Sequence, residues 1–232
     1  MKRIDPAQME AKRRAAERAV ALVEDGMVLG LGSGSTAALA LEALAKRIAG
    51  GLWIGGGIPT SERTAVIAKR LGIPLTDFER SPQIDLAIDG ADQVERGTLN
   101  LVKGLGGALL REKIVASASK TVVIVADETK LVQQLGAATP VPVEIVRFGW
   151  QAVLERLRGL GCTAELRRID RATFVTDGGN YVADCSFDAI PDAAGLEASI
   201  KRIAGVIESG LFIDLASQAV IGNAEGVEIL AR

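Results

Sequence analysis

The chain has 232 residues, of which 48% are apolar and only 3% aromatic. This length allows one domain, or a main domain with a smaller companion. Twenty-seven basic and 29 acidic residues give a net charge of −2. The balanced charge and the few aromatic rings argue against the basic, base-stacking surface of a nucleic-acid-binding protein. No run approaches the roughly 18 apolar residues of a membrane span, so neither nucleic acid nor membrane is expected as a partner.

The sequence contains no histidine and only two cysteines, Cys162 and Cys185. The absence of histidine removes the Ser-His and Cys-His nucleophile arrangements and the commonest zinc ligand. If the protein is an enzyme, its proton transfers must therefore use carboxylates and lysines. The cysteines show neither metal-ligand spacing nor a disulfide framework, and the first residues do not resemble a secretory leader. We therefore expect reduced thiols in a cytoplasmic protein.

Up to about residue 130, expected strands alternate with expected helices. Apolar runs bounded by turn residues indicate strands, and Ala- and Leu-rich segments with capping residues indicate helices. The expected strands are 27–31, 52–54, 73–78, 84–88 and 121–126. The expected helices are 5–24, 37–48 and 60–71, with one more around residue 112. This alternation predicts an α/β fold with a mostly parallel sheet covered by helices on both faces.

From about residue 131 the pattern changes to short strands and two helices, with a hairpin signal at Asp177-Gly-Gly-Asn. This change predicts a smaller α+β domain inserted into the main domain. Strands at 211–213 and 219–221 are expected to return to the first sheet. The expected domains are a main α/β catalytic domain, 1–130 plus 207–232, and a small α+β domain, 131–206.

The segment Gly30–Thr36 reads GLGSGST and joins an expected strand to an expected helix. It lacks the lysine of a P-loop, and Ser35 stands where a dinucleotide fingerprint has its third glycine. One interpretation is an ordinary strand-to-helix turn. The other is a phosphate cradle for a ligand without a nucleotide, because a helix N-terminus presents free amides to an anion. The three hydroxyl side chains favour the phosphate cradle.

A second group of polar residues follows the expected strand at 84–88 and continues into a helix. It contains Asp89, Asp92, Lys103 and Glu112. Taken singly, an aspartate in a turn usually bonds its own backbone, and a lone charged residue usually faces solvent. Ligands bind at such strand ends in open α/β sheets. Together, the four residues therefore predict an anion-binding site with acid/base groups.

The segments GLGSGST, DGAD and KGLGGALLREK occur in this order and resemble the signature segments of type A ribose-5-phosphate isomerases. The resemblance covers almost the whole chain. It continues through TSERT at 60–64, ADETK at 126–130, PVE at 142–144, D-x-GN ending at Asn180 and GLF at 210–212. The resemblance implies homodimers or homotetramers that act in the non-oxidative pentose phosphate pathway. Such enzymes interconvert D-ribose 5-phosphate and D-ribulose 5-phosphate through an enediol, without a metal or other cofactor.

The resemblance also implies a role for each site residue. Glu112 is implied to move the proton between C1 and C2, and Asp89 to open the sugar ring. Asp92 and Lys103 are implied to form another charged pair, in which Lys103 stabilises the enediolate oxygen. The implied substrate- and phosphate-binding residues are Ser33, Gly34, Ser35, Thr36, Lys12, Lys130, Gly104 and Gly106.

Two positions depart from the family pattern. Leu105 stands where relatives usually have glycine. Glycine adopts a left-handed backbone angle readily and leucine does not, so the leucine argues against such an angle at this position. Gln93 stands where many relatives have glutamate, so one nearby charge is missing. Neither departure removes an implied catalytic group.

Two alternative functions belong to similar folds. One is a non-catalytic sugar-phosphate-sensing domain of a transcription regulator, and the other is an enzyme such as an amino-sugar phosphate deaminase or a CoA transferase. The roughly 25 residues before Met27 form a single expected helix, which is too little for a helix-turn-helix. The intact segment from Lys103 to Glu112 argues against both enzymes.

Overall fold

The computed structural model describes residues 5–137 and 139–232. The chain forms two compact units, and each unit is assembled from separate segments of the sequence. Unit 1 takes its described residues from Met1–Ala91, Arg111–Leu131 and Leu215–Arg232, and unit 2 takes its residues from Asp92–Leu110 and Val132–Asp214. Among the described residues, no helix has the length and hydropathy needed to cross a membrane.

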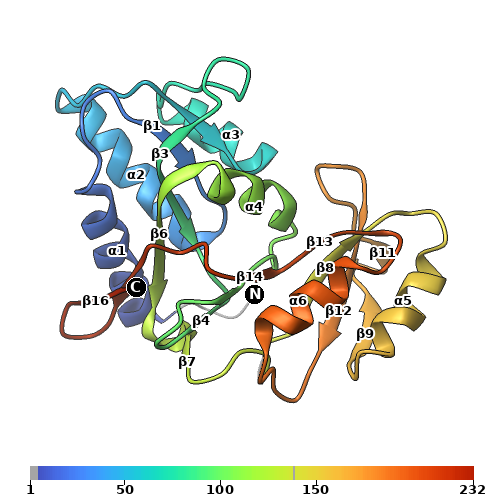
Figure 1. Ribbon diagram of the computed structural model, residues 1–232. Coiled ribbons are helices and arrows are strands. Elements are labelled where there is room, and N and C mark those ends of the chain that lie inside the picture. Colours follow the sequence, from blue (N-terminus) through green and yellow to red (C-terminus); the bar gives the residue numbers. More distant parts are fainter. Residues whose placement is uncertain (1–4, 138) are drawn as a thin grey trace. The chain divides into compact units, whose positions relative to one another are not determined.

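Unit 1 is built on a six-stranded sheet with the order β16-β15-β6-β3-β1-β2 (Figure 1). All neighbouring strands run parallel except β16, which is antiparallel to β15. The strands are β1 (Val28–Leu31), β2 (Gly56–Pro59), β3 (Ile84–Gly90), β6 (Ser119–Asp127), β15 (Gln218–Gly222) and β16 (Val227–Ala231). The expected mostly parallel sheet is therefore confirmed.

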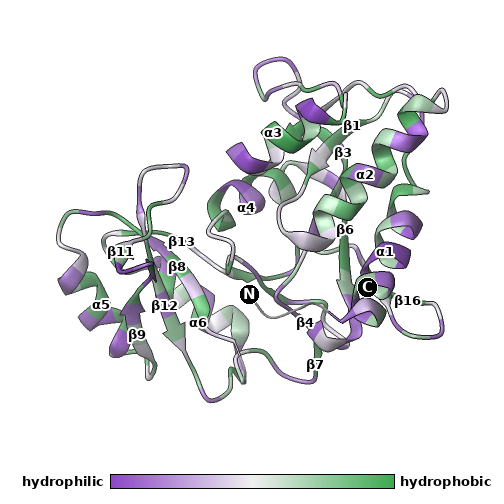
Figure 2. Ribbon diagram, turned by 180° about the vertical axis from the view of Figure 1, so that it is seen from behind, coloured by the Kyte–Doolittle hydropathy of each residue, from purple (hydrophilic) through white to green (hydrophobic). Residues whose placement is uncertain are grey.

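Helices cover both faces of this sheet. On one face, strand residues such as Leu29 and Ile88 share a core cluster with Ala16 of α1 and Leu44 of α2. On the other face, a Cβ added to Gly30 would lie 2.6 Å from Val115 of α4. Figure 2 shows β6 in the green of hydrophobic residues, whereas α1 is largely purple. The helices of this unit are α1 (Pro6–Val20), α2 (Ser35–Ala49), α3 (Glu62–Arg70) and α4 (Leu109–Ser117).

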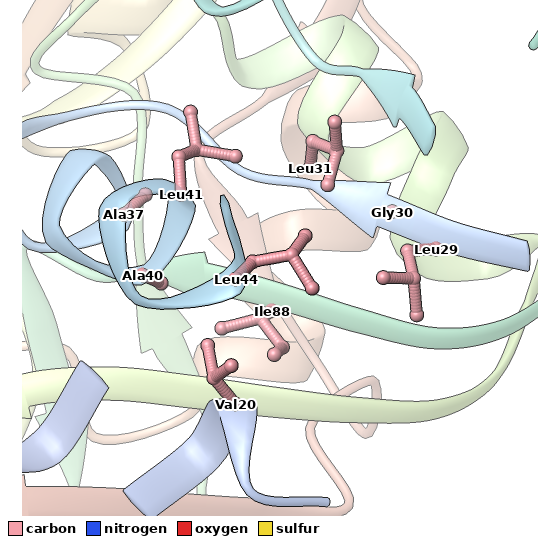
Figure 3. A pocket seen from close by; sticks show the side chains of 9 residues that line it. All are labelled: Val20, Leu29, Gly30, Leu31, Ala37, Ala40, Leu41, Leu44 and Ile88. Carbon is pink, nitrogen blue, oxygen red and sulfur yellow. The ribbon is translucent and has the colours of Figure 1, made fainter. Parts of the chain in front are cut away.

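A small cavity lies in the core of unit 1 and has a volume of about 10 Å³. Figure 3 shows that aliphatic side chains surround it. Its lining residues are Val20, Leu29, Gly30, Leu31, Ala37, Ala40, Leu41, Leu44 and Ile88. A cavity of this size holds at most one water, and an apolar lining keeps such a space dry. The cavity is therefore a packing gap and not a ligand site.

Unit 2 contains two four-stranded sheets and a short hairpin. The first sheet, β13-β8-β12-β9, is antiparallel and packs with α5 and α6 around a core that includes the two free thiols Cys162 and Cys185. The second sheet has the order β14-β5-β4-β7. The strands of the first sheet and its helices are β8 (Val141–Ile145), β9 (Thr163–Leu166), β12 (Tyr181–Ser186), β13 (Val206–Ser209), α5 (Trp150–Arg158) and α6 (Ala193–Lys201). The remaining strands are β4 (Gln93–Glu95), β5 (Leu101–Val102), β7 (Leu131–Val132), β14 (Leu211–Phe212), β10 (Arg168–Ile169) and β11 (Ala172–Thr173).

Two expected strands of the first half were wrong. Residues 52–54 form a loop, and the strand follows at β2, within the glycines that were expected to form a turn. The reason is close packing, because a Cβ on Gly57 would lie 2.5 Å from the side chain of Leu31 on β1. The expected strand at 73–78 is reduced to one bridge, between Leu75 and Gly57.

The expected return of two strands to the first sheet is correct for only one of them. β15 pairs with β6, but β14 pairs with β5 in unit 2. For the same reason, residues 92–110 and 207–214, which we expected in the main domain, belong to unit 2. Their strands β4, β5 and β14 form one sheet together with β7. The pairing of β5 with β14 joins segments about 110 residues apart in sequence, which a local pattern does not reveal.

Candidate active site

Two motifs that are distant in sequence meet at the edge of the unit 1 sheet. From β1 the chain passes to β2 on one side of β1 and then returns to β3 on the other side. Ligands of doubly wound sheets bind at the carboxyl ends of strands where the winding direction reverses in this way. Here the GLGSGST segment begins in the last residues of β1, and Asp89 is the second-last residue of β3. The Gly32 N–H donates to the Ile88 carbonyl at 3.0 Å.

Asp89 is held by the backbone of the loop that follows β1. Asp89 is only 5% exposed. Its Oδ1 accepts hydrogen bonds from the N–H groups of Ser33 at 3.0 Å and Gly90 at 2.7 Å. A Cβ on Gly32 would lie 2.3 Å from the same oxygen. Only glycine at position 32 therefore allows the loop to approach the carboxylate this closely.

The hydroxyl of Ser33 lies inside a cluster of hydroxyl side chains. Its Oγ is 2.8 Å from Thr60 Oγ1, 2.8 Å from Ser61 Oγ and 3.0 Å from Thr64 Oγ1. Thr60 and Thr64 also donate to the carbonyls of Leu31 and Gly32. A hydroxyl has one hydrogen to donate, and Thr60 and Thr64 give theirs to carbonyls, so Ser33 donates its own hydrogen within this cluster. The Ser33 side chain therefore fastens the loop to the start of α3.

Sequence reasoning did not identify this hydroxyl cluster. Thr60, Ser61 and Thr64 are buried, and Ser61 is also the N-cap of α3. The only signal was that the TSERT segment resembles the family pattern. This resemblance does not show which residues the three hydroxyls contact. The contact depends on β1 and β2 being neighbours in the sheet.

The start of α2 is open toward solvent. Gly34 is the N-cap with a φ of 95°, and no side chain caps the first amides of the helix. Gly34 and Ser35 are exposed, whereas Thr36 is buried. Lys12 of α1 places its ammonium 3.3 Å from the Ser35 hydroxyl. Free amides, hydroxyls and one cation at a helix N-terminus can bind a phosphate group, as the second interpretation of this segment requires.

A buried carboxylate fixes Lys12. Asp127 at the end of β6 lies 3.7 Å from the Lys12 ammonium and accepts hydrogen bonds from Gln8 and Thr129. Burial by itself would raise the pKa of Asp127, but the hydrogen bonds from Thr129 and Gln8 and the charge of Lys12 outweigh burial and hold the pKa below its ordinary value. Asp127 is therefore ionised at neutral pH, and it was not among the expected site residues.

Two further expected residues belong to unit 1. Glu112 lies in the first turn of α4 and is only 6% exposed. Lys130 ends the short 3-10 helix Glu128–Lys130 directly after β6. Unit 1 therefore contains the expected site residues Asp89, Glu112, Lys12 and Lys130, together with the complete GLGSGST segment.

The other expected residues belong to unit 2. Lys103 is 3% exposed, and its ammonium lies 5.5 Å from the centre of the Phe212 ring. Asp92 accepts through Oδ2 from the N–H of Leu105 at 2.9 Å. Gly104 and Gly106 lie in the loop between Lys103 and α4. Asp92 thus shapes the loop that follows Lys103, a task that the sequence did not suggest.

The two departures from the family pattern are accommodated locally. Leu105 is not among the non-glycine residues with a positive φ, and its side chain is exposed. The left-handed angle questioned at this position is therefore absent. Gln93 is buried, and its Oε1 accepts from the N–H of Gly136 at 2.9 Å.

An open helix start with a fixed lysine lies next to a buried carboxylate at the switch point of a doubly wound sheet. This combination is typical of enzymes that act on a small phosphorylated substrate. Comparisons with known proteins identify the class more closely. Residues 56–226 match the family model described as ribose 5-phosphate isomerase A (phosphoriboisomerase A).

Individual relatives agree with the family model over nearly their full length. The chain is 54% identical over 219 residues to ribose-5-phosphate isomerase A of Gloeobacter violaceus, which covers 94% of this chain and 95% of that protein. The structure of ribose 5-phosphate isomerase A from Methanocaldococcus jannaschii has a TM-score of 0.92 at 40% identity, covering 96% of this chain and 99% of that one. A D-ribose-5-phosphate isomerase in complex with phospho-erythronic acid has a TM-score of 0.92 at 39% identity, covering 96% and 98%.

The chain therefore belongs to the ribose 5-phosphate isomerase A family, a family of aldose–ketose isomerases that interconvert ribose 5-phosphate and ribulose 5-phosphate. The family, the α/β fold and the enzyme class predicted from the sequence are confirmed.

Proposed function

We propose that this chain catalyses the interconversion of D-ribose 5-phosphate and D-ribulose 5-phosphate with Glu112 as the proton-transferring base. The observation that carries this proposal is a buried glutamate in the same unit as an open, lysine-bearing helix start and a fixed aspartate. In a chain without histidine, a carboxylate is the natural group to remove a carbon-bound proton.

The proposed reaction begins with ring opening by Asp89. Its carboxylate accepts the proton of the anomeric hydroxyl, and the same carboxyl group gives this proton to the ring oxygen as the ring C–O bond breaks. Glu112 then removes the proton from C2 of the open aldose, and the electron pair forms the C1–C2 double bond of the enediolate. A proton then moves from the hydroxyl on C2 to the oxyanion on C1, the carboxyl group of Glu112 returns its proton to C1, and the oxygen on C2 becomes the ketone carbonyl. Lys103 supplies positive charge for the enediolate oxygen.

The phosphate is assigned to the start of α2 and to two lysines. Ser35, Thr36 and Lys12 form this site within unit 1, and Lys130 is added by the resemblance. Ser33 contributes through its N–H, which holds Asp89, while its hydroxyl lies within the hydroxyl cluster at the start of α3. Gly104 and Gly106 are assigned to the substrate through their backbone. The solved relative with phospho-erythronic acid supports this class of ligand, since that compound joins a phosphate to a carboxylate that mimics an enediolate.

The proposed reaction uses no metal or other cofactor. Among residues 5–137 and 139–232, no three His, Cys, Asp or Glu side chains are grouped as a metal site would require. We further propose a cytoplasmic homodimer or homotetramer, as the family resemblance implies.

The decisive experiment compares wild type with Glu112→Gln in the presence of a metal chelator. We expect wild type to convert ribose 5-phosphate at full rate in the chelator, because no step uses a metal. Glu112→Gln keeps the shape of the side chain but does not accept a proton, so kcat should fall by about 10²–10⁴-fold at nearly constant KM. In heavy water, wild type should introduce deuterium at C2 of the aldose, and the variant should lose this exchange together with turnover.

Arg111→Ala is the matched control, because Arg111 is the neighbouring residue and its guanidinium donates to Glu62 at 2.8 Å on the surface. This variant should retain most of the activity. A sensor domain or a deaminase would not convert ribose 5-phosphate at all. If Glu112→Gln turns over normally while Asp89→Asn loses exchange, the base is Asp89 and the assignment of Glu112 is wrong.

A further inference from the structure

Arg167 makes a set of contacts in unit 2 that no expected role explains. It follows β9, and its side chain is only 10% exposed. Its Nη1 donates to the carbonyls of Gly104 at 2.8 Å and Leu105 at 2.9 Å. Its Nε donates to Asp184 Oδ2 at 2.9 Å, and its Nη2 donates to Asp184 Oδ1.

Asp184 determines how the guanidinium is used. The two-point contact with this carboxylate fixes the plane of the guanidinium and aims Nη1 at the loop. It also neutralises the charge of Arg167, so the residue is not a free cation for a substrate phosphate. The guanidinium therefore acts as a rigid donor to the backbone.

The loop held by Arg167 is the segment that follows Lys103. In a trans peptide the N–H points opposite to the C=O. The carbonyls of Gly104 and Leu105 point to Arg167, so the N–H groups of Leu105 and Gly106 point away from it. The Leu105 N–H accordingly reaches Asp92 at 2.9 Å, and the Gly106 N–H belongs to a residue that the proposed function assigns to the substrate.

An aromatic ring completes the support of this loop. The Arg167 guanidinium lies 5.8 Å from the centre of the Phe174 ring. Gly107, with a φ of 82°, packs so closely that a Cβ would lie 2.3 Å from Phe174. The loop is thus held at its start by Arg167 and at its end by Phe174.

We propose that Arg167, oriented by Asp184, is a positioning residue for the isomerase reaction, and that it fixes the loop of residues 104–107 and thereby the backbone donors beside Lys103. This inference rests on the proposed function, in which Lys103 stabilises the enediolate and Gly104 and Gly106 of this loop bind the substrate through their backbone. A loop displaced by about 1 Å would reduce the rate by up to about 10²-fold. The loss should appear mainly in kcat, because interactions made in the transition state are affected.

The experiment compares Arg167→Lys with Arg147→Lys. Arg147 is a matched control in the same unit, since it donates to the carbonyl of Gly179 at 2.5 Å and lies 5.4 Å from the Tyr181 ring, but does not contact the loop. Lysine keeps the charge but cannot reproduce four directed hydrogen bonds. We expect Arg167→Lys to lower kcat by about 10–100-fold with KM nearly unchanged, and Arg147→Lys to lower it little.

Hydrogen–deuterium exchange gives a second measurement, independent of activity. Amides in the peptide covering 103–110 should exchange faster in Arg167→Lys and at the normal rate in Arg147→Lys. Asp184→Asn should show the same two effects to a smaller extent, because Arg167 keeps its carbonyl contacts but loses its orientation. If Arg167→Lys does not fold, Asp184→Asn against Arg147→Lys decides the question.

The outcomes separate this inference from the proposed function. If wild type fails to convert ribose 5-phosphate, the proposed function is wrong and the assignment of Arg167 falls with it. If wild type is active and Arg167→Lys has normal kcat, or loses activity only in proportion to its loss of folded protein, Arg167 has a structural role alone. Equal effects of the Arg167 and Arg147 substitutions would overturn the inference as well.

Discussion

Ser33 and Ser35 stand two positions apart in one loop, but their hydroxyls have different surroundings. Ser33 lies among three buried hydroxyls, whereas Ser35 is exposed and lies 3.3 Å from the Lys12 ammonium. Ser35→Ala should therefore raise KM by about 10-fold, because one hydrogen bond to a charged group is lost equally in ground and transition states. Its kcat should change little.

Ser33→Ala should behave differently. It leaves Thr60, Ser61 and Thr64 with fewer partners, so the free energy of unfolding should fall by about 1–3 kcal/mol while KM changes little. Steady-state kinetics and urea unfolding of both variants measure the difference. If Ser33→Ala raises KM as much as Ser35→Ala does, the Ser33 hydroxyl contacts the phosphate as well as the cluster.

The sequence predicted which residue types the site contains but not how each one is used. The hydroxyl-rich turn, Asp89 and Glu112 were identified by type and position at expected strand and helix ends. The sequence did not show that Ser33 faces inward, because its partners are 27–31 residues away. Asp127 and Arg167 were missed since a single charged residue looks the same in sequence whether it is exposed or buried against a partner.

At the scale of single elements, α1 shows why small side chains matter in this fold. Ala15, Ala16 and Ala19 are fully buried where the helix packs on α2 and the sheet. Ala19→Leu inserts three carbon atoms into a filled space and should destabilise the protein by about 1–3 kcal/mol. Glu17→Leu, an exposed position of the same helix, controls for helix propensity and should change stability little. Thermal or urea unfolding measures both, and equal stability of the two variants would show that the core has room.

Strands that were expected from apolar runs between turn residues were largely found, but the glycine-rich strand β2 was not. A run of glycine normally indicates a turn, and here the neighbouring Leu31 explains its place in the sheet. The strand β16 was also missed, because its residues alternate between exposed and half-buried as expected for an edge strand. The order of strands depends on partners far apart in the chain, so it was predicted only at the level of a parallel sheet.

At the scale of the whole molecule, acid should weaken the fold through Asp127. Its pKa lies below the ordinary value of 3.8 when the protein is folded. A lowered folded pKa means that the group stabilises the protein above its unfolded pKa, and that this stabilisation is lost as the pH falls through the folded value. Asp85, whose pKa is lowered by hydrogen bonds from Lys120 and Val28, has the same sign of effect but lies nearer to the surface.

Asp127→Asn should therefore cost about 1.5–3 kcal/mol at neutral pH, as is usual for hydrogen bonds to a charged group. The difference from wild type should shrink as the pH falls below 3.8. Urea unfolding of both proteins at pH 7 and across the acid range measures this. A difference that stays constant down to the lowest pH would mean that the charge of Asp127 does not contribute.

The position of β15 between β6 and β16 has a consequence for how the protein is made. A nascent chain emerges from the ribosome with its N-terminus first, and most domains begin to fold as they emerge. Here β6 ends at residue 127, but its partner begins only at residue 218. All of the 132–214 part of unit 2 is synthesised in the interval. During that time the nascent sheet has β6 as an uncovered edge, open to pairing with a neighbouring nascent chain, and β15 protects this edge only after residues 218–222 have been synthesised.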